Sequence, residues 1–262
     1  MTNVLHAIVL GIVQGLTELL PISSSAHLYA IPQFLGWGEI GDFDVALHAG
    51  TLLAIAIFFF KDWIQLIVGG YKKVVKKEDS FEGKMFWYLV AATIPGGIIG
   101  FVLDKYCEDF LTNPLVIGLA LIVMGIALYI VDKNAKNEVE YKDMTFRQTF
   151  IIGVSQALAF IPGVSRSGIT MTMGRLMGVK REAVARYSFM LSAPIVLAAT
   201  IYKLKDFVFN PAFFVGVFVS FIVGLLVIKF LLNYLKKGDF KWFAIYRVLF
   251  GLAVILFLVI LK

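Results

Sequence analysis

The feature that most constrains this chain is a series of apolar runs, each as long as a lipid bilayer is thick. A helix needs about 20 apolar residues, with roughly 17–25 tolerated, to cross the hydrocarbon core. Unpaired backbone groups are not tolerated in lipid, so these runs predict an all-α polytopic membrane protein. Six stretches are predicted as spans: Phe43–Phe60, Phe86–Leu103, Leu115–Val131, Tyr187–Tyr202, Ala212–Leu232 and Phe243–Leu261.

The composition supports this class. Of the 262 residues, 60% are hydrophobic and 16% are charged, whereas soluble domains have about 45–50% and about 25%. The net charge of +6 would suit an anionic polymer, but the basic residues lie in blocks between apolar runs. We therefore expect the bilayer as a partner and no nucleic acid. Cys107 is the only cysteine, which excludes an internal disulfide and a cysteine-based metal cage.

The positions of Lys and Arg predict which loops face the cytoplasm, where basic residues are enriched. Four segments hold eighteen of the twenty-four basic residues and are predicted to be cytoplasmic. The connections 104–114 and 203–211, together with both chain termini, are then expected outside the cell membrane. The four basic segments are Lys61–Lys84, Lys133–Arg147, Arg175–Arg186 and Lys229–Lys241.

Two further apolar regions, Val4–Leu35 and Phe146–Met177, are interrupted near their middles. Pro21 and Pro162 lie at the breaks, and each is followed by a serine cluster. Each half is too short to span a bilayer, so each region is predicted to be a re-entrant hairpin. Non-helical backbone at membrane depth survives where it is buried in protein or lines a wet cavity, which makes the breaks the expected place for chemistry.

The two broken regions resemble each other at a constant offset of 142 positions. Each half of the chain, 1–135 and 143–262, would contain one hairpin and three spans. An odd number of crossings gives the halves opposite orientations, so we predict an inverted-topology repeat within a single membrane domain, 1–262. Such repeats bring helix N-termini to a bound anion near the midplane, and the two serine clusters should face each other. The matched residues include Gly11–Leu16 with Gly153–Leu158, Ser23 with Ser165, and Ser25 with Ser167.

The first break carries residues that suggest a nucleophile and a base. Gln14 and Glu18 are four positions apart, so they share a helix face. Ser24 and His27 are three apart, and a helix after the break would let the imidazole reach the hydroxyl. A carboxylate within the membrane is costly and marks Glu18 as functional, whereas a buried amide such as Gln14 can also serve only to join helices.

The second break, Pro162–Thr170, is a glycine-bracketed turn with one arginine and several hydroxyls. Arg166 at membrane depth is a functional candidate for the same energetic reason as a buried carboxylate. The turn resembles an anion cradle, although serines at helix starts also act as simple caps. Three more ionisable residues have weaker signals. Asp44 and His48 fit an interfacial position, and Arg247 fits snorkelling or pairing with a carboxylate.

The segments Gln14–His27 and Pro162–Thr170 together resemble the undecaprenyl-diphosphatases of the bacitracin-resistance type. Phe43–Thr51 and Phe243–Arg247 also resemble family segments, so the likeness covers most of the chain. The resemblance implies a cell-membrane hydrolase that converts undecaprenyl diphosphate to undecaprenyl phosphate and inorganic phosphate. This reaction recycles the lipid carrier of cell-wall synthesis.

The resemblance also implies roles for individual residues. It places Glu18, Ser24, His27 and Arg166 at catalytic positions, with Mg²⁺ or Ca²⁺ held by Glu18 and Gln14. The family uses Glu or Gln at position 14, and Gln weakens any scheme with two carboxylates. Our preferred scheme has Ser24 attacking the phosphorus and His27 acting as base and then acid, with direct attack by water as the alternative. Substrate-binding roles are expected for Gln14, Ser23, Ser25, Gly163, Ser165, Ser167, Gly168 and Thr170.

Two other function classes remain open from the sequence. Inverted repeats with broken helices are common in secondary transporters, so the chain could move a polyprenyl phosphate lipid across the membrane. A third possibility is a protein that only sequesters the lipid. Serine beside histidine favours hydrolysis over both, because a carrier or binder needs no nucleophile. The sequence leaves a homodimer open.

Overall fold

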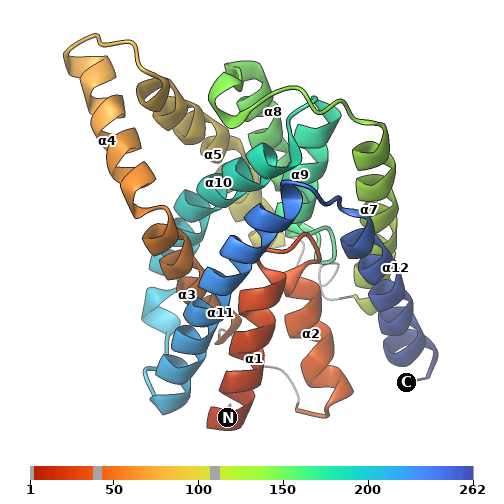
Figure 1. Cartoon of the computed structure of the whole chain (residues 1–262). Coiled ribbons are helices and arrows are strands. Elements are labelled where there is room, and N and C mark those ends of the chain that lie inside the picture. Colours follow the sequence, from red (N-terminus) through yellow and green to blue (C-terminus); the bar gives the residue numbers. More distant parts are fainter. Residues whose placement is uncertain (1–2, 38–42, 107–112, 262) are drawn as a thin grey trace.

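The computed structural model describes residues 3–37, 43–106 and 113–261, and this part of the chain is helical (Figure 1). Its only β-structure is an isolated bridge between Val139 and Val179. Cys107 and most of the expected outer connection 104–114 lie outside the described residues. The elements are α1 Val4–Thr17, α2 Ser24–Phe34, α3 Phe43–Phe58, α4 Phe60–Val75, α5 Phe81–Tyr106, α7 Pro114–Asn134, η1 Tyr141–Asp143, α8 Phe146–Ser155, η2 Gln156–Phe160, α9 Arg166–Leu176, α10 Arg181–Tyr202, η3 Leu204–Asp206, α11 Pro211–Leu235, α12 Lys241–Ile255 and η4 Leu256–Ile260.

Four of the described helices are long and apolar enough to cross a membrane. They are α7, α10, α11 and the continuous α12–η4. These helices contain or nearly coincide with four of the predicted spans. The predicted span Phe86–Leu103 lies within α5, a helix of 26 residues.

α3 covers most of the predicted span Phe43–Phe60, but the prediction of a loop directly after it is wrong. The chain bends by 76° between α3 and α4, and the two helices together would make a fifth span. Phe59 at the bend is buried, and α4 continues as a helix through the segment that was predicted to be a loop. It does so because its small residues Gly69 and Gly70 pack closely on Gly83 and Phe86 of α5. The structure therefore supports four or five spans rather than six.

The two predicted hairpins are present as α1–α2 and α8–η2–α9. Their helices have 14, 11, 10 and 11 residues, which corresponds to about 15–21 Å each at 1.5 Å per residue. Each arm is thus shorter than the roughly 30 Å hydrocarbon core. In Figure 1, α1 and α2 lie at one end of the molecule and α8 at the other, so the hairpins enter from opposite ends.

Glycines let the first arm of each hairpin approach a long helix of the other half. A Cβ atom at Gly11 would lie 2.8 Å from the Gly216 carbonyl oxygen of α11, and one at Gly153 would lie 2.5 Å from the Ala92 carbonyl oxygen of α5. Side chains at these positions would push the helices apart. Gly11 and Gly153 are equivalent at the offset of 142 positions.

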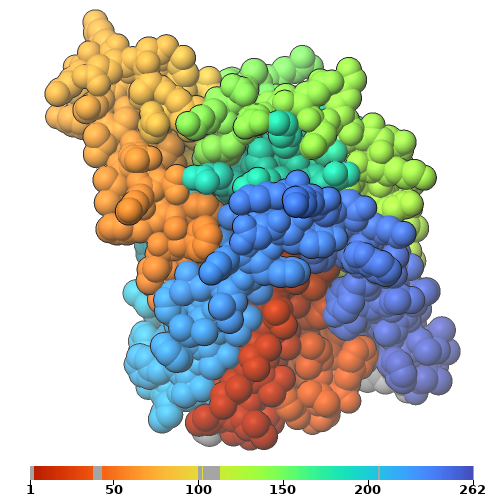
Figure 2. Space-filling view, viewed as in Figure 1, coloured from red at the N-terminus to blue at the C-terminus, as the bar shows by residue number. Residues whose placement is uncertain are grey.

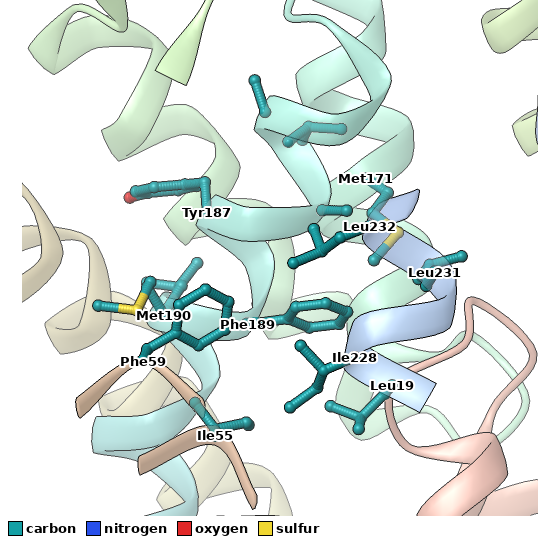
Figure 3. Close-up of a cluster of buried hydrophobic side chains, with 14 of the residues drawn as sticks. Leu19, Ile55, Phe59, Met171, Tyr187, Phe189, Met190, Ile228, Leu231 and Leu232 are labelled. Atoms are coloured by element: carbon teal, nitrogen blue, oxygen red, sulfur yellow. The ribbon is translucent and has the colours of Figure 1, made fainter. Parts of the chain in front are cut away.

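The largest buried apolar cluster fixes the tip of the first hairpin. Phe189 of α10 lies in this cluster with Ile228 of α11 and Phe59 (Figure 3). Leu19, which directly follows Glu18 in the chain, joins the same cluster beside Ile228. Close packing of this kind holds side chains in single rotamers, so the backbone next to Glu18 is anchored.

The outer surface is apolar along the helices. α11 lies across α1 on the face shown in Figure 2, and the structure exposes a stripe of its side chains at every fourth position. Exposed apolar area on this scale indicates contact with lipid. The stripe consists of Phe214, Phe218, Ile222, Leu226 and Phe230.

Both described chain ends lie at the same end of the molecule in Figure 1. The connections from α4 to α5 and from α7 to α8 lie at the opposite end. These two connections belong to the segments that are rich in Lys. The relative placement of the termini and the basic loops therefore agrees with the predicted topology.

Candidate active site

The turns at the two hairpin tips have the same backbone geometry. Ser23 precedes α2 with φ 76°, and Ser165 precedes α9 with φ 70°. A left-handed conformation at a residue other than glycine costs roughly 1–3 kcal/mol and often marks a functional site. In each turn the serine hydroxyl lies 3.2 Å from that of the serine two residues later, Ser25 or Ser167.

The two turns touch, which confirms the expectation that the serine clusters face each other. The Gly163 backbone N–H donates to the Ser23 hydroxyl at 3.2 Å. The Ser167 hydroxyl lies 2.9 Å from the Leu20 carbonyl oxygen and 3.2 Å from that of Glu18. Residues about 140 positions apart in the chain thus form one contiguous polar region.

Arg247 of α12 holds the two turns together from behind. Its side chain is fully buried, and its guanidinium donates to the carbonyl oxygens of Pro21 at 3.0 Å, Gly163 at 2.7 Å and Val164 at 2.9 Å. The predicted snorkelling or carboxylate pairing is wrong, since its hydrogen bonds in the described structure all go to backbone carbonyls. Gly163 has φ 94°, and a Cβ there would lie 2.4 Å from the Ile117 carbonyl oxygen.

A cavity of about 250 Å³ opens beside the two turns. Polar groups from both hairpins line one side, and apolar residues of α10 line another. Six of the predicted site residues contribute to its lining, namely Glu18, Ser23, Ser24, Ser25, Ser165 and Arg166. The other lining residues are Val45, His48, Gln156, Ala159, Phe160, Ile195, Val196, Ala199 and Thr200.

Glu18 is the centre of this polar region. One of its carboxylate oxygens, Oε1, pairs with the Arg166 guanidinium. The other, Oε2, accepts from the Ser24 hydroxyl at 2.5 Å and from the Gln14 amide at 3.3 Å. Nε2 of His48 lies 3.2 Å from the same oxygen. A nearly buried carboxylate is thus shared by the Arg166 guanidinium, the His48 imidazole and the predicted nucleophile.

The predicted contact between His27 and Ser24 is wrong. Nδ1 of His27 lies 2.7 Å from the Ser23 carbonyl oxygen, and Nε2 lies 2.7 Å from the Tyr246 hydroxyl. Three-residue spacing places the two side chains near each other on a helix, but the Glu18 carboxylate is a stronger acceptor for the serine hydroxyl. The catalytic role of His27 remains a prediction, without support from a contact with Ser24.

The other predicted residues lie behind the cavity lining. Thr170 bridges the Arg166 carbonyl oxygen and the Ser188 hydroxyl, at 2.8 and 2.7 Å. The Gly168 N–H donates to the Ser165 hydroxyl at 3.1 Å. Such groups are suited to hold the turn rather than to touch a ligand. The predicted residues outside the lining are Gln14, His27, Gly163, Ser167, Gly168 and Thr170.

The groups predicted to hold a divalent cation do not form a site by themselves. Both oxygens of Glu18 are engaged by hydrogen-bond donors, two of them on Arg166 and His48. Oε1 of Gln14 is a buried oxygen without a partner among the described residues. It is the one atom of the pair that is free to bind a cation. Nowhere in the described ranges do three His, Cys, Asp or Glu side chains come together to hold a metal ion. A carboxylate neutralised in this way attracts a hard cation weakly.

The structure brings two residues to the site that the sequence did not place there, His48 and Arg247. The sequence predicts an interfacial position for His48 and snorkelling or carboxylate pairing for Arg247, although each is an ionisable residue within an apolar run. That signal alone favours a functional role at membrane depth. What the sequence lacked was a partner, because Glu18 and the turn carbonyls lie on other elements.

Comparison with known proteins identifies the family. The family model described as "Bacitracin resistance protein BacA" matches residues 7–253. The chain belongs to this family. Proteins named undecaprenyl-diphosphatase match over almost the whole length. The relative from Pelotomaculum thermopropionicum is 49% identical over 257 residues, covering 97% of this chain and 96% of the relative. Those from Desulforudis audaxviator and Moorella thermoacetica are 48% and 46% identical, with 97% of each chain covered.

Proposed function

We propose that this BacA family member hydrolyses undecaprenyl diphosphate to undecaprenyl phosphate and inorganic phosphate in the cell membrane. The observation that carries the proposal is the contact of the Ser24 hydroxyl with Glu18 in a cavity that also contains Arg166. A nucleophile, a proton acceptor and a fixed positive charge are the groups that phosphoanhydride cleavage requires. The relatives named undecaprenyl-diphosphatase support the lipid diphosphate as substrate. Neither the family nor these names support a transporter.

The cavity suits the head group rather than the whole lipid. Its volume of about 250 Å³ is below the roughly 300–1,000 Å³ of pockets that enclose drug-sized ligands. The diphosphate would lie against Arg166 and the serine turns. The apolar wall formed by Ile195, Val196 and Ala199 of α10 would then receive the first isoprene units, while the remaining chain stays in lipid.

The geometry favours a covalent route through Ser24. The Oγ atom would attack the terminal phosphorus and transfer its proton to Oε2 of Glu18, which lies 2.5 Å away. The bond from phosphorus to the bridging oxygen breaks, and undecaprenyl phosphate leaves. Water then cleaves the phosphoserine and releases inorganic phosphate. In this scheme Glu18 takes the role of base that was predicted for His27, and direct attack by water activated by Glu18 is the alternative.

Substrate binding would also make Glu18 a better proton acceptor. In the free protein its carboxylate is paired with Arg166 and lies against His48. Phosphate oxygens compete for the same cations, and each cation that turns to the phosphate leaves Glu18 with less stabilisation of its negative charge. The base would therefore act only when the substrate is in place.

A divalent cation remains a prediction of the family resemblance. When bound, Mg²⁺ or Ca²⁺ would neutralise phosphate charge and orient the oxygens. Because Glu18 is already paired, most of the ligands to such a cation would have to come from the substrate.

The inverted repeat and the sidedness belong to the same proposal. Three features recur in both halves, 1–135 and 143–262: a short hairpin, a left-handed serine at its tip, and a first arm packed by a glycine on a long helix of the other half. Both termini would lie outside, because the Lys-rich connections lie at the opposite end of the molecule and such loops are enriched in the cytoplasm. The first hairpin then enters from outside.

The test is phosphate release from polyprenyl diphosphate by purified protein in detergent. Ser24→Ala and Arg166→Ala should each abolish release by protein that is still folded at the assay temperature, as its thermal unfolding curve shows; Arg166→Ala should unfold at a lower temperature, because Glu18 loses its partner. Ser80→Ala is the matched control, since Ser80 caps a helix start in the α4–α5 connection and should release phosphate normally. Lipid binding without any phosphate release by the wild-type protein would refute the proposed function.

A further inference from the structure

The cavity also contains a histidine to which the family resemblance gives no role. His48 of α3 lines it, with its side chain 25% exposed. Nδ1 of its ring lies 2.8 Å from the Asp44 carbonyl oxygen, and Nε2 lies 3.2 Å from Oε2 of Glu18. Both neighbours are hydrogen-bond acceptors only. A neutral imidazole carries one N–H, so both contacts are satisfied only when both nitrogens carry a proton.

His27 has the opposite hydrogen-bonding environment. Its Nδ1 faces the Ser23 carbonyl oxygen, which requires an N–H there, but its Nε2 faces the Tyr246 hydroxyl. A phenol can donate, so the neutral imidazole satisfies both contacts. The ring is also stacked on Phe250, with centroids 4.0 Å apart, in a buried position. The geometry therefore assigns the positive charge to His48 and not to His27.

α3 holds His48 in place. The Ser220 hydroxyl of α11 donates to the Leu47 carbonyl oxygen at 2.9 Å. The Thr51 hydroxyl donates to the backbone carbonyl oxygen of His48, also at 2.9 Å. Gly50 brings α3 so close to α11 that a Cβ there would lie 2.4 Å from the Val217 carbonyl oxygen. A group positioned in advance loses little entropy on binding and needs no rearrangement when charge arrives.

We propose that the His48 imidazolium is a catalytic residue that binds the terminal phosphate opposite Arg166, and that Glu18 holds this anion position in the free protein. The inference rests on the proposed function, because it assigns the ligand to the same cavity. The carboxylate of Glu18 spans the two cations, with Oε1 on Arg166 and Oε2 beside His48. A phosphate also carries negatively charged oxygens, so it can replace those contacts while the Glu18 carboxylate keeps its hydrogen bond from Ser24.

The test compares two substitutions that separate charge from hydrogen bonding. His48→Gln keeps an N–H donor and removes the charge, whereas His48→Lys keeps the charge. The ligand is a prenyl methylenediphosphonate, in which a CH₂ group replaces the bridging oxygen so that no variant can hydrolyse it. Binding is measured by calorimetry on the full chain in detergent, and thermal unfolding is recorded for each variant.

We expect His48→Gln to weaken binding about tenfold or more, which corresponds to about 1.4 kcal/mol or more, because a neutral amide donates to the phosphate without the positive charge that strengthens the hydrogen bond. His48→Lys should recover most of that loss. His6→Gln is the control, because His6 stacks on Trp37 and does not line the cavity; it should bind as the wild type does. The same variants should show the same order in KM for the lipid substrate.

The inference is overturned if folded His48→Gln binds the analogue within twofold of wild type. It is also overturned if folded His48→Lys binds as poorly as His48→Gln. A different result would refute the proposed function: wild-type protein that binds the analogue but releases no phosphate from the lipid substrate. In that outcome a charge-dependent loss at His48 would still support an anion site.

Discussion

Replacing Glu18 by Gln removes the one negative charge that the two cations of the cavity share. The substitution keeps the size of the side chain, so the packing of Leu19 in the apolar cluster should not change. In the wild-type protein the carboxylate pairs with Arg166 and lies 3.2 Å from His48. In the variant both groups stay partly buried without their counter-charge.

Glu18→Gln should lower both the free energy of unfolding and the turnover, but it should strengthen binding of the head group. Removing one partner of a buried ion pair lowers the free energy of unfolding by about 3–5 kcal/mol. A single contact at 3.2 Å has a Coulomb energy of about 5 kcal/mol at an effective dielectric constant of about 20, which agrees with that range. Turnover should fall by roughly 10²–10⁴, the usual contribution of a general base.

Binding of the anionic head group should become tighter in the same variant. The free protein no longer offers Arg166 and His48 an internal carboxylate, so the phosphate oxygens displace nothing when they bind. We expect the dissociation constant of the methylenediphosphonate to fall about tenfold, which corresponds to about 1.4 kcal/mol. A substitution that weakens the fold and turnover but strengthens binding is hard to attribute to misfolding.

The assays are thermal unfolding, phosphate release and calorimetric binding, all in detergent. Glu140→Gln is the matched control, because Glu140 pairs with Lys180 at 2.5 Å on the exposed surface; it should change none of the three. Turnover of Glu18→Gln within tenfold of wild type would refute the role of Glu18 as base. Equal or weaker binding of the analogue would refute the competition between the carboxylate and the phosphate.

The remaining predictions concern the turns, the second histidine and the cation. Arg247→Met should lower the free energy of unfolding by at least about 4 kcal/mol, at roughly 1.5–3 kcal/mol for each of the hydrogen bonds from the charged guanidinium to the carbonyls of Pro21, Gly163 and Val164, and should lower phosphate release; wild-type unfolding would show that these bonds do not hold the turns. Gly163→Ala should destabilise strongly because of its φ and the nearby carbonyl oxygen, whereas Gly97→Ala, with open space around it, should not; equal unfolding temperatures would contradict the packing argument. Tyr246→Phe leaves a buried nitrogen of His27 without its partner at 2.7 Å and should cost about 1–3 kcal/mol in stability with little change in KM, so a large rise in KM would place His27 at the substrate. EDTA should stop phosphate release, yet equilibrium dialysis of the free protein should detect no tight Mg²⁺ or Ca²⁺ binding; one cation bound tightly per free chain would show that Glu18 and Gln14 form a preformed site.

Most of the helical architecture could be predicted from apolar run length. Pro21 and Pro162 indicated the two breaks because each is followed by a cluster of serines; proline alone does not end a helix here, since Pro95 and Pro194 lie within α5 and α10. The lysines from Lys61 onward predict a loop after the span Phe43–Phe60, because charged residues usually end a membrane helix, but the structure has the helix α4 there. In the folded protein Gly69 and Gly70 give α4 a flat face that packs on α5, and that contact compensates for the exposed charges.

The contacts within the site were less predictable than its location. The spacing of Ser24 and His27 is compatible with a hydrogen bond, but sequence spacing does not say which acceptor competes for the hydroxyl. Glu18 wins because the hairpin turn brings its carboxylate to 2.5 Å from Ser24. His27 turns away because Tyr246, more than 200 positions later, supplies a partner.

Local sequence is enough to predict that the chain is a membrane protein, that two apolar segments break at serine clusters, and that ionisable residues lie in these clusters. These properties depend on local composition and on the cost of burying charge, which each segment has on its own. Which side chains meet depends on how the helices pack: Glu18 contacts Arg166 and His48, and Arg247 contacts both turns. Those contacts join residues that are 30 to about 225 positions apart, and their energies depend on close packing and low dielectric that exist only after the helices assemble.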